Sequence, residues 1–151
     1  MSAFTSTARL SKPFLFLLAG IAAIQIIILA LFAFMPSEGG GLLPISIGVP
    51  VFVLLLSVPM LFATTRLTID AEQVHAKTFG FFSTTIKRSD IVDAQVGAPT
   101  GLGAGAGLRI MGNRTTGYLT GGPNLALELA DGTRIAVSTP RPEEAKKALG
   151  Y

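Results

Sequence analysis

The sequence predicts an α-helical transmembrane hairpin followed by a small all-β domain that ends in a helix. Two runs of 23 residues, 13–35 and 42–64, contain no Lys, Arg, Asp, Glu or His. Each run would form a helix of about 34 Å, long enough to cross a hydrocarbon core of about 30 Å. After Thr64 the sequence instead alternates apolar and polar residues between Gly, Asp and Asn breaks, a pattern that is typical of antiparallel strands.

The first run is expected to stay as a helix and not to be removed as a signal peptide. It is longer than the core of about 7–15 residues that signal peptides have, and no small-x-small cleavage site follows it. The residues between the runs, Pro-Ser-Glu-Gly-Gly-Gly at 36–41, favour a reversal, so the helices would be antiparallel. The predicted organisation is a cytoplasmic tail at 1–12, the hairpin at 13–64 and a β domain at 65–151.

Basic residues flank the predicted hairpin on the side of the chain termini. Arg9 and Lys12 precede the first run and Arg66 follows the second, whereas the loop between the runs carries only Glu38. Because Lys and Arg are retained on the cytoplasmic side, the sequence predicts a multi-pass protein of the inner (plasma) membrane with both termini cytoplasmic. The lipid bilayer is therefore the first expected partner.

Small side chains mark one surface of the first run. Gly20, Ala22 and Ala23 would let another helix approach closely, and Gln25 is the one amide in either run. The Gln25 amide could hydrogen-bond across helices or to its own helix. These four residues are the candidate helix–helix interface. No ionisable group lies inside either run, so no transport path is expected.

From Arg66 onward the pattern predicts about seven half-buried antiparallel strands, arranged as a sandwich or partly open barrel. The clearest hairpin has alternating apolar residues on both sides of a two-residue Asp131-Gly132 turn. The Gly- and Ala-rich segment 97–107 is expected to be a flexible loop between strands. It lacks the Gly-Lys-Ser/Thr and G-x-G-x-x-G patterns of phosphate-binding loops.

The chain is expected to end in a short helix. Thr139 would cap its start, with Pro140 or Pro142 in the first turn. Acidic residues near its start and basic residues near its end suit the helix dipole. Gly150 would terminate the helix.

Several short segments of the predicted β domain are similar in sequence to one protein family. They are Leu-Thr-Ile-Asp at 67–70, Ile-Lys-Arg-Ser-Asp-Ile at 86–91, Gly-Leu-Arg-Ile at 107–110, Leu-Glu-Leu-Ala-Asp-Gly at 127–132, Ile-Ala-Val-Ser-Thr at 135–139 and Pro-Glu-Glu at 142–144. Together with about seven strands and a closing helix, they resemble the bacterial pleckstrin-homology-like (PH-like) domains that follow one or two membrane helices in small bacterial proteins. The resemblance covers roughly residues 65–149. It implies a fold and a membrane setting, because most members of this group have no assigned biochemical activity.

Composition excludes several kinds of chemistry. The chain has no cysteine, which excludes disulfides, thiol catalysis and Cys-ligated zinc. His75 is the one histidine and no suitably placed nucleophile accompanies it, so no catalytic residue, metal site or cofactor is predicted. The net charge of +3 is not concentrated in one basic run, and no nucleic-acid partner is expected.

Five basic residues are the candidate surface or lipid contacts: Lys77, Lys87, Arg88, Arg109 and Arg114. Each cation near an anionic cytoplasmic leaflet would contribute about 1 kcal/mol of attraction. The alternatives are scattered solvated charges and, for Arg109, a cross-strand pair with Glu128. Tyr118 and Phe81 are expected to be either exposed contacts or ordinary core residues.

These patterns favour a membrane-anchored, non-catalytic binding or scaffolding module at the cytoplasmic face, whose partner is a protein or an anionic inner-leaflet lipid. The alternative is an accessory subunit of a larger membrane or envelope complex, with the helical hairpin as the interface. A homo-oligomer stays open as additional support for a small core. An enzyme is the least favoured hypothesis, and it would have to rely on His75 or Arg109.

Overall fold

The computed structural model describes residues 4–34 and 43–151 of the chain. The chain divides into two compact units. The helical unit is Lys12–Phe62, and the β unit combines the residues on both sides of it, Met1–Ser11 and Ala63–Tyr151. The segment before the first helix and the segment after the second therefore belong to the same unit.

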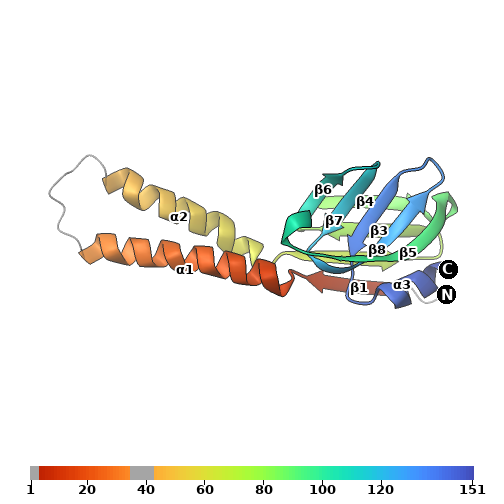
Figure 1. Ribbon diagram of the computed structural model, residues 1–151, viewed down its shortest axis with the longest axis horizontal. Helices are drawn as coiled ribbons and strands as arrows, with labels where there is room; N and C mark the ends of the chain where they lie inside the picture. Colours follow the sequence, from red (N-terminus) through yellow and green to blue (C-terminus); the bar gives the residue numbers. More distant parts are fainter. Residues whose placement is uncertain (1–3, 35–42) are drawn as a thin grey trace. The chain divides into compact units, whose positions relative to one another are not determined.

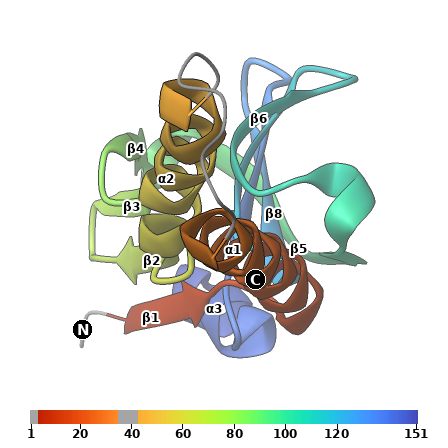
Figure 2. The ribbon, with the colours of Figure 1, turned by 90° about the vertical axis from the view of Figure 1, so that its left-hand side faces the viewer.

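The helical unit contains α1, Lys12–Phe34, and α2, Leu43–Met60, which lie side by side (Figure 1 and Figure 2). Among the described helices, α1 is long and apolar enough to cross a membrane, whereas the apolar segment Ile45–Met60 is shorter than a span requires. The structure thus gives one membrane-span candidate where the sequence predicts two. The predicted turn at 36–41 lies outside the described residues.

The second apolar run is predicted to be helical up to Thr64, but α2 ends at Met60. The next two residues make backbone hydrogen bonds of the tighter i,i+3 kind, as at many helix ends. Thr64 and Thr65 already belong to a strand, where the buried Thr65 hydroxyl bonds the Thr78 hydroxyl at 2.6 Å. Apolar composition cannot reveal this boundary, because the strand pairing that decides it involves residues elsewhere in the chain.

Within the described residues, the β unit contains nine strands in two sheets, more than the predicted seven or so. One sheet has the order β1-β2-β3-β4 and the other the order β5-β8-β9-β7-β6. Figure 2 shows β2, β3 and β4 on one side and β5, β6 and β8 on the other. The bounds are Phe4–Arg9 (β1), Thr64–Ile69 (β2), Gln73–Thr78 (β3), Phe82–Lys87 (β4), Ile91–Thr100 (β5), Gly107–Met111 (β6), Thr115–Leu119 (β7), Gly122–Leu129 (β8) and Arg134–Ser138 (β9).

The strand directions depart from the prediction at one place. Neighbouring strands are antiparallel, as predicted, except that β7 and β9 run parallel. The hairpins β6–β7 and β8–β9 lie next to each other, which places β9 between β8 and β7. The periodicity of a strand shows which side chains are buried, but it does not show the direction of the neighbouring strand.

The predicted N-terminal tail contributes a strand to the β unit. β1 pairs with β2 along its whole length, ending with Arg9 opposite Thr64. The hydroxyl of Ser6 is buried and bonds that of Thr139 at 2.7 Å. The sequence misses this strand because its partner lies beyond the whole helical unit.

The interior between the sheets is filled mainly by aliphatic side chains contributed by both sheets. α3, Pro142–Leu149, closes one open edge of the sandwich beside β2, β5 and β8 (Figure 2). It buries Ala145 and Leu149 against this core. The predicted closing helix is therefore present, and it packs as an amphipathic lid on the sandwich.

The ends of α3 follow the prediction in part. Gly150 has a φ of 90° and ends the helix in the left-handed conformation, as predicted. The start is different, because Arg141 and not Thr139 occupies the N-cap position. The Thr139 hydroxyl instead accepts the backbone N–H of Arg141 at 3.3 Å.

The Gly- and Ala-rich segment is only partly a loop. β5 extends through Gly97 to Thr100, paired with β8. The buried Asn124 donates its side-chain amide to the carbonyl of Ala98 at 2.6 Å, and it occupies the space in which a Cβ at Gly97 would lie. Glycine at position 97 is thus a packing requirement, and the loop is confined to 101–106.

Candidate functional site

The outer side of the four-stranded sheet is a positively charged, hydroxyl-rich surface, which we name the cationic face. Side chains along these strands alternate between the buried interior and the outer surface. The four strands contain no Asp or Glu. The outward residues include Thr5, Thr7, Arg9, Arg66, Thr68, His75, Lys77, Ser83, Thr85 and Lys87.

The strand register places cations of this face next to each other. Arg66 lies opposite Thr7 on β1 and opposite Lys77 on β3. Like charges directly opposite each other on a sheet repel and weaken the pairing. Because the four strands supply no carboxylate to offset this repulsion, the cationic face favours an anionic partner.

His75 occupies the middle of the cationic face, opposite Thr68 and Thr85. Its Nδ1 lies 2.8 Å from the Thr85 hydroxyl oxygen, at hydrogen-bond distance. Across the described residues, no three His, Asp or Glu side chains gather as a metal site would require. The surroundings of His75 therefore suit polar surface contact.

Two of the five predicted contact residues, Lys77 and Lys87, lie exposed on the cationic face. Arg88 has another role. Its guanidinium donates to the carbonyl of Asp70 at 3.2 Å and to that of Leu149 at 2.9 Å. Arg88 therefore joins the β2–β3 turn to the C-terminus of α3.

Arg109 and Arg114 belong to the five-stranded sheet. The Arg109 guanidinium lies against Gly105, where its Nε would be 2.5 Å from an added Cβ. The predicted pair of Arg109 with Glu128 is wrong, because Glu128 pairs with Arg134 at 3.2 Å across β8 and β9. Glu128 and Arg134 lie opposite each other on neighbouring strands, so the side chains of this exposed ion pair meet directly.

Arg114 forms part of the β6–β7 turn. Asn113 and Arg114 have φ values of 58° and 54°, the left-handed pair of a type I′ hairpin turn. The turn is closed by a hydrogen bond from the Thr115 N–H to the Gly112 carbonyl at 3.3 Å. The side chain of Arg114 is exposed here, apart from the cationic face.

Sequence reasoning misses two cations of the face. Arg9 falls in the predicted tail, and Arg66 counts only toward the membrane orientation. The signal that could have found β1 is the alternation of Thr5, Thr7 and Arg9 with Ser and Ala, which repeats the polar alternation of β2. Only the pairing of β1 with β2 brings Arg9 onto the same surface as Lys77.

One end of the β unit differs in charge from the other. We name the linker end the side of the sandwich with Arg9 and Thr64, which the chain leaves for α1 and rejoins after α2. The strand pairs, together with the Ser11 N–H bond to the Thr120 carbonyl at 2.8 Å, show which strand ends and turns lie on this side. Its segments are residues 7–9, 64–67, 76–84, 96–109, 117–125 and 137–138.

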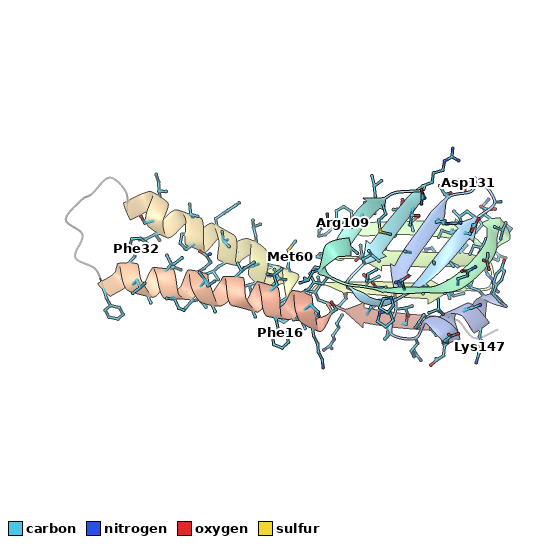
Figure 3. The ribbon with its side chains drawn as sticks, viewed as in Figure 1. Phe16, Phe32, Met60, Arg109, Asp131 and Lys147 are labelled. Carbon is cyan, nitrogen blue, oxygen red and sulfur yellow. The ribbon has the colours of Figure 1, made fainter. Side chains whose placement is uncertain are left out.

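The linker end contains Arg and Lys but no acidic residue. Its four cations are Arg9, Arg66, Lys77 and Arg109, and all eight Asp and Glu residues of the β unit lie outside its segments. Figure 3 shows Arg109 at this end and Asp131 in the β8–β9 turn at the other. An anionic surface would therefore meet attraction, without carboxylate repulsion, at the linker end.

Asp131 is held in its charged form. The Thr133 hydroxyl donates a hydrogen bond to its carboxylate, and the Thr133 backbone N–H donates another at 2.8 Å. Both bonds lower the pKa of Asp131 below its ordinary value, and the bond from the Thr133 hydroxyl has the larger effect. The lowered pKa means that Asp131 stays ionised to a more acidic pH than an ordinary aspartate.

Two depressions open on the surface of the β unit. One, of about 170 Å³, is lined by Asp93, Gln95, Ala126, Leu127, Glu128 and Arg134. The other, of about 380 Å³, is lined by Ala71, Glu72, Gln73, Lys87, Arg88 and Ser89. In the first depression, Arg134 is paired with Glu128. The second lies at the edge of the cationic face, because it includes Lys87 of that face next to Glu72. Each depression thus contains carboxylate side chains, which the strands of the cationic face lack.

The four predicted interface residues of the helical unit divide into two pairs. Ala22 is buried and Gln25 half-buried, on the protected stripe of α1 that recurs every three to four residues. Gly20 and Ala23 are exposed, and a Cβ at Gly20 would meet nothing within 4 Å. Phe16 points away from α2 in Figure 3 and is likewise exposed.

Comparison of the chain with protein-family models gives no match, and comparison with curated proteins gives no match either. The candidate surface therefore rests on the geometry and the charge pattern of the β unit.

The two carbonyl contacts of Arg88 predict that this residue stabilises the fold. Arg88→Met would keep the aliphatic stem but lose both hydrogen bonds, and we expect the free energy of unfolding to fall by about 1–2 kcal/mol. Lys87→Met is the matched control, because the neighbouring Lys87 is exposed and should change stability by less than about 0.5 kcal/mol. Thermal unfolding in detergent, followed by circular dichroism, measures both. Equal stability of the two variants would contradict the structural role of Arg88.

Proposed function

We propose that this chain is a membrane-anchored, non-catalytic binding module that works at the cytoplasmic face of the inner membrane. The observation that carries this proposal is the cationic face, a sheet surface with Arg and Lys on four neighbouring strands and no carboxylate among them. The apolar helix α1 supports the membrane anchor. Anchoring raises the effective concentration of such a face at the membrane, so weak individual charge contacts suffice.

The anionic inner leaflet, or a protein bound to it, is the partner that the charge of the cationic face favours. Surface cations gain about 1 kcal/mol each near such a leaflet, and the gain falls off within a Debye length of about 10 Å. Only Leu10 and Ser11 separate Arg9 from the first residue of α1. This short connection keeps Arg9 within about 10 Å of the start of α1. Attraction between Arg9 and anionic headgroups still acts over that distance.

The resemblance to bacterial PH-like domains is part of the proposal. It is supported by the two-sheet sandwich and by the closing helix α3. Two features differ from the simple expectation, namely the added strand β1 and the parallel pair of β7 and β9. The function proposed here depends on the cationic face and does not require the family assignment.

Charge reversal on the cationic face tests the binding proposal. A fluorophore on Ser83→Cys, opposite Lys77 on the neighbouring strand, reports on this surface, and the absence of native cysteine makes the label unique. In full-length protein in nanodiscs, adding phosphatidylglycerol should shift the fluorophore emission. Lys77→Glu should reduce that shift by at least half, since it replaces attraction by repulsion.

Two features make this charge reversal interpretable. Lys77→Glu places a carboxylate opposite Arg66, so the sheet pairing should be strengthened and unfolding cannot explain a lost signal. Lys147→Glu on α3 changes the net charge by the same amount and should leave the shift unchanged. A shift that is the same in all three proteins would refute lipid recognition by the cationic face.

Single cysteines test the proposed orientation. We expect an impermeant maleimide to label Gly40→Cys in intact cells, since position 40 lies between the helices and on the external side if both termini are cytoplasmic. Ser89→Cys, an exposed site in the β unit, should react only after the cells are permeabilised. Labelling of Ser89→Cys in intact cells would place the β unit outside and exclude an inner-leaflet partner.

The alternative function, an accessory subunit of a larger membrane complex, is favoured by the exposed small residues of α1. Gly20 and Ala23 leave room for a further helix, while Ala22 and Gln25 lie on the protected stripe. Gly20→Leu would fill that room and should abolish co-purification of a partner subunit. Unchanged co-purification would count against this interface.

A further inference from the structure

The turn between β3 and β4 exposes aromatic side chains. Phe81 is 73% exposed and Phe82 39% exposed, and their rings meet edge to face with centroids 4.7 Å apart. We name Phe79–Phe82 the aromatic tip. Large apolar side chains gathered on a hairpin turn are unfavourable in water, and such exposed groups indicate a contact site.

The strand register fixes the place of the aromatic tip within the β unit. The Phe79 N–H donates to the carbonyl of Thr64 at 2.9 Å, and Thr64 lies opposite Arg9. Two residues join Arg9 to α1, and three residues join Met60 of α2 to Thr64. The aromatic tip therefore lies at the linker end, beside the two points at which the chain passes to and from the helices.

The aromatic tip has an uncommon backbone conformation. Phe79 and Gly80 have φ values of 55° and 78°, so two successive residues adopt the left-handed conformation. That conformation is uncommon for a bulky residue, and packing must hold it in place. The Phe79 ring supplies this packing, since it lies 3.6 Å from the position of a Cβ at Gly107. The aromatic tip is thus tied to the five-stranded sheet, while Phe81 is mostly exposed and Phe82, which lies opposite the buried Thr78, is partly exposed.

Two cations lie on the strands next to the aromatic tip, and no acid accompanies them. Lys77 lies on the cationic face directly before the turn, with Arg66 opposite it. No segment of the linker end contains Asp or Glu. Apolar rings next to Lys and Arg are typical of segments that lie in the headgroup region of anionic membranes, where the rings leave water and the cations meet lipid phosphates.

We propose that the aromatic tip inserts into the headgroup region of the membrane that α1 crosses, as a second contact that orients the β unit on the bilayer. Phe81 and Phe82 enter the boundary between headgroups and acyl chains, and Lys77 and Arg66 bind lipid phosphates around them. The proposed occupant of the surface is an anionic bilayer. This inference rests on the membrane anchoring proposed above, and it adds a named site of insertion.

Tryptophan fluorescence tests the insertion directly, because the chain contains no tryptophan. Phe81→Trp in the full-length protein is reconstituted into phosphatidylcholine and phosphatidylglycerol vesicles, with and without lipids brominated near the headgroup. We expect blue-shifted emission and quenching by the brominated lipids to less than half of the unquenched intensity. Val92→Trp is the control, because Val92 is 52% exposed at the other end of β5. Its emission should stay at the wavelength of exposed tryptophan and should not be quenched.

Flotation of the vesicles after an alkaline wash separates the two proposals. Protein that floats while Phe81→Trp is quenched no more than Val92→Trp keeps the membrane anchor and overturns the insertion. Protein that is stripped from the vesicles overturns both. Quenching of Phe81→Trp that is lost in pure phosphatidylcholine, or after Lys77→Glu, supports an anionic bilayer as the occupant. Strong quenching that persists both in pure phosphatidylcholine and after Lys77→Glu would overturn the proposed role of Lys77 and Arg66 in binding lipid phosphates.

Discussion

The pairing of β1 with β2 is the constraint on which the rest of the structure depends. It joins the residues before α1 to those after α2, so the whole helical unit is an insertion between two neighbouring strands. The pairing fixes where each helix can begin or end, since Arg9 and Thr64 must lie opposite each other. Its outer end is held by Arg141, which donates to the Thr5 carbonyl at 3.1 Å and stacks over the Phe4 ring.

Buried hydroxyl pairs help to specify this arrangement. Thr65 bonds Thr78 between β2 and β3, and Ser6 bonds Thr139 between β1 and the segment before α3. A buried hydroxyl without a partner costs about 1–3 kcal/mol, so each pair disfavours a shifted register. A slip of one residue would also turn Arg66 and Lys77 into the interior. The polar interior and the cationic exterior therefore require the same strand alignment, and the cationic face is a consequence of it.

The distribution of charge in the β unit connects this alignment to the proposed function. The cations without acidic neighbours, the short connections to both helices and the exposed aromatic tip all occur at the linker end. Acidic residues, including the ionised Asp131, are confined to the rest of the unit. Under the proposed function, this separation places attraction without carboxylate repulsion at the end from which the chain passes to the helices.

The sequence by itself determined the apolar α1, the alternating strands after Thr64, the hairpin around Asp131-Gly132 and the closing helix with its Gly150 end. These features depend on local periodicity and on residues with special backbone preferences, which act over a few neighbours. The predicted two-residue turn of that hairpin is wrong, because Leu129 pairs with Thr133 and the Gly132 N–H bonds the Leu129 carbonyl, which makes a loop of residues 130–132. Tertiary structure alone decided β1, the end of α2 at Met60, the parallel pair of β7 and β9, and the partners of Arg88 and Arg109. Each of these depends on contacts between segments far apart in the chain, whose free energy no local pattern contains.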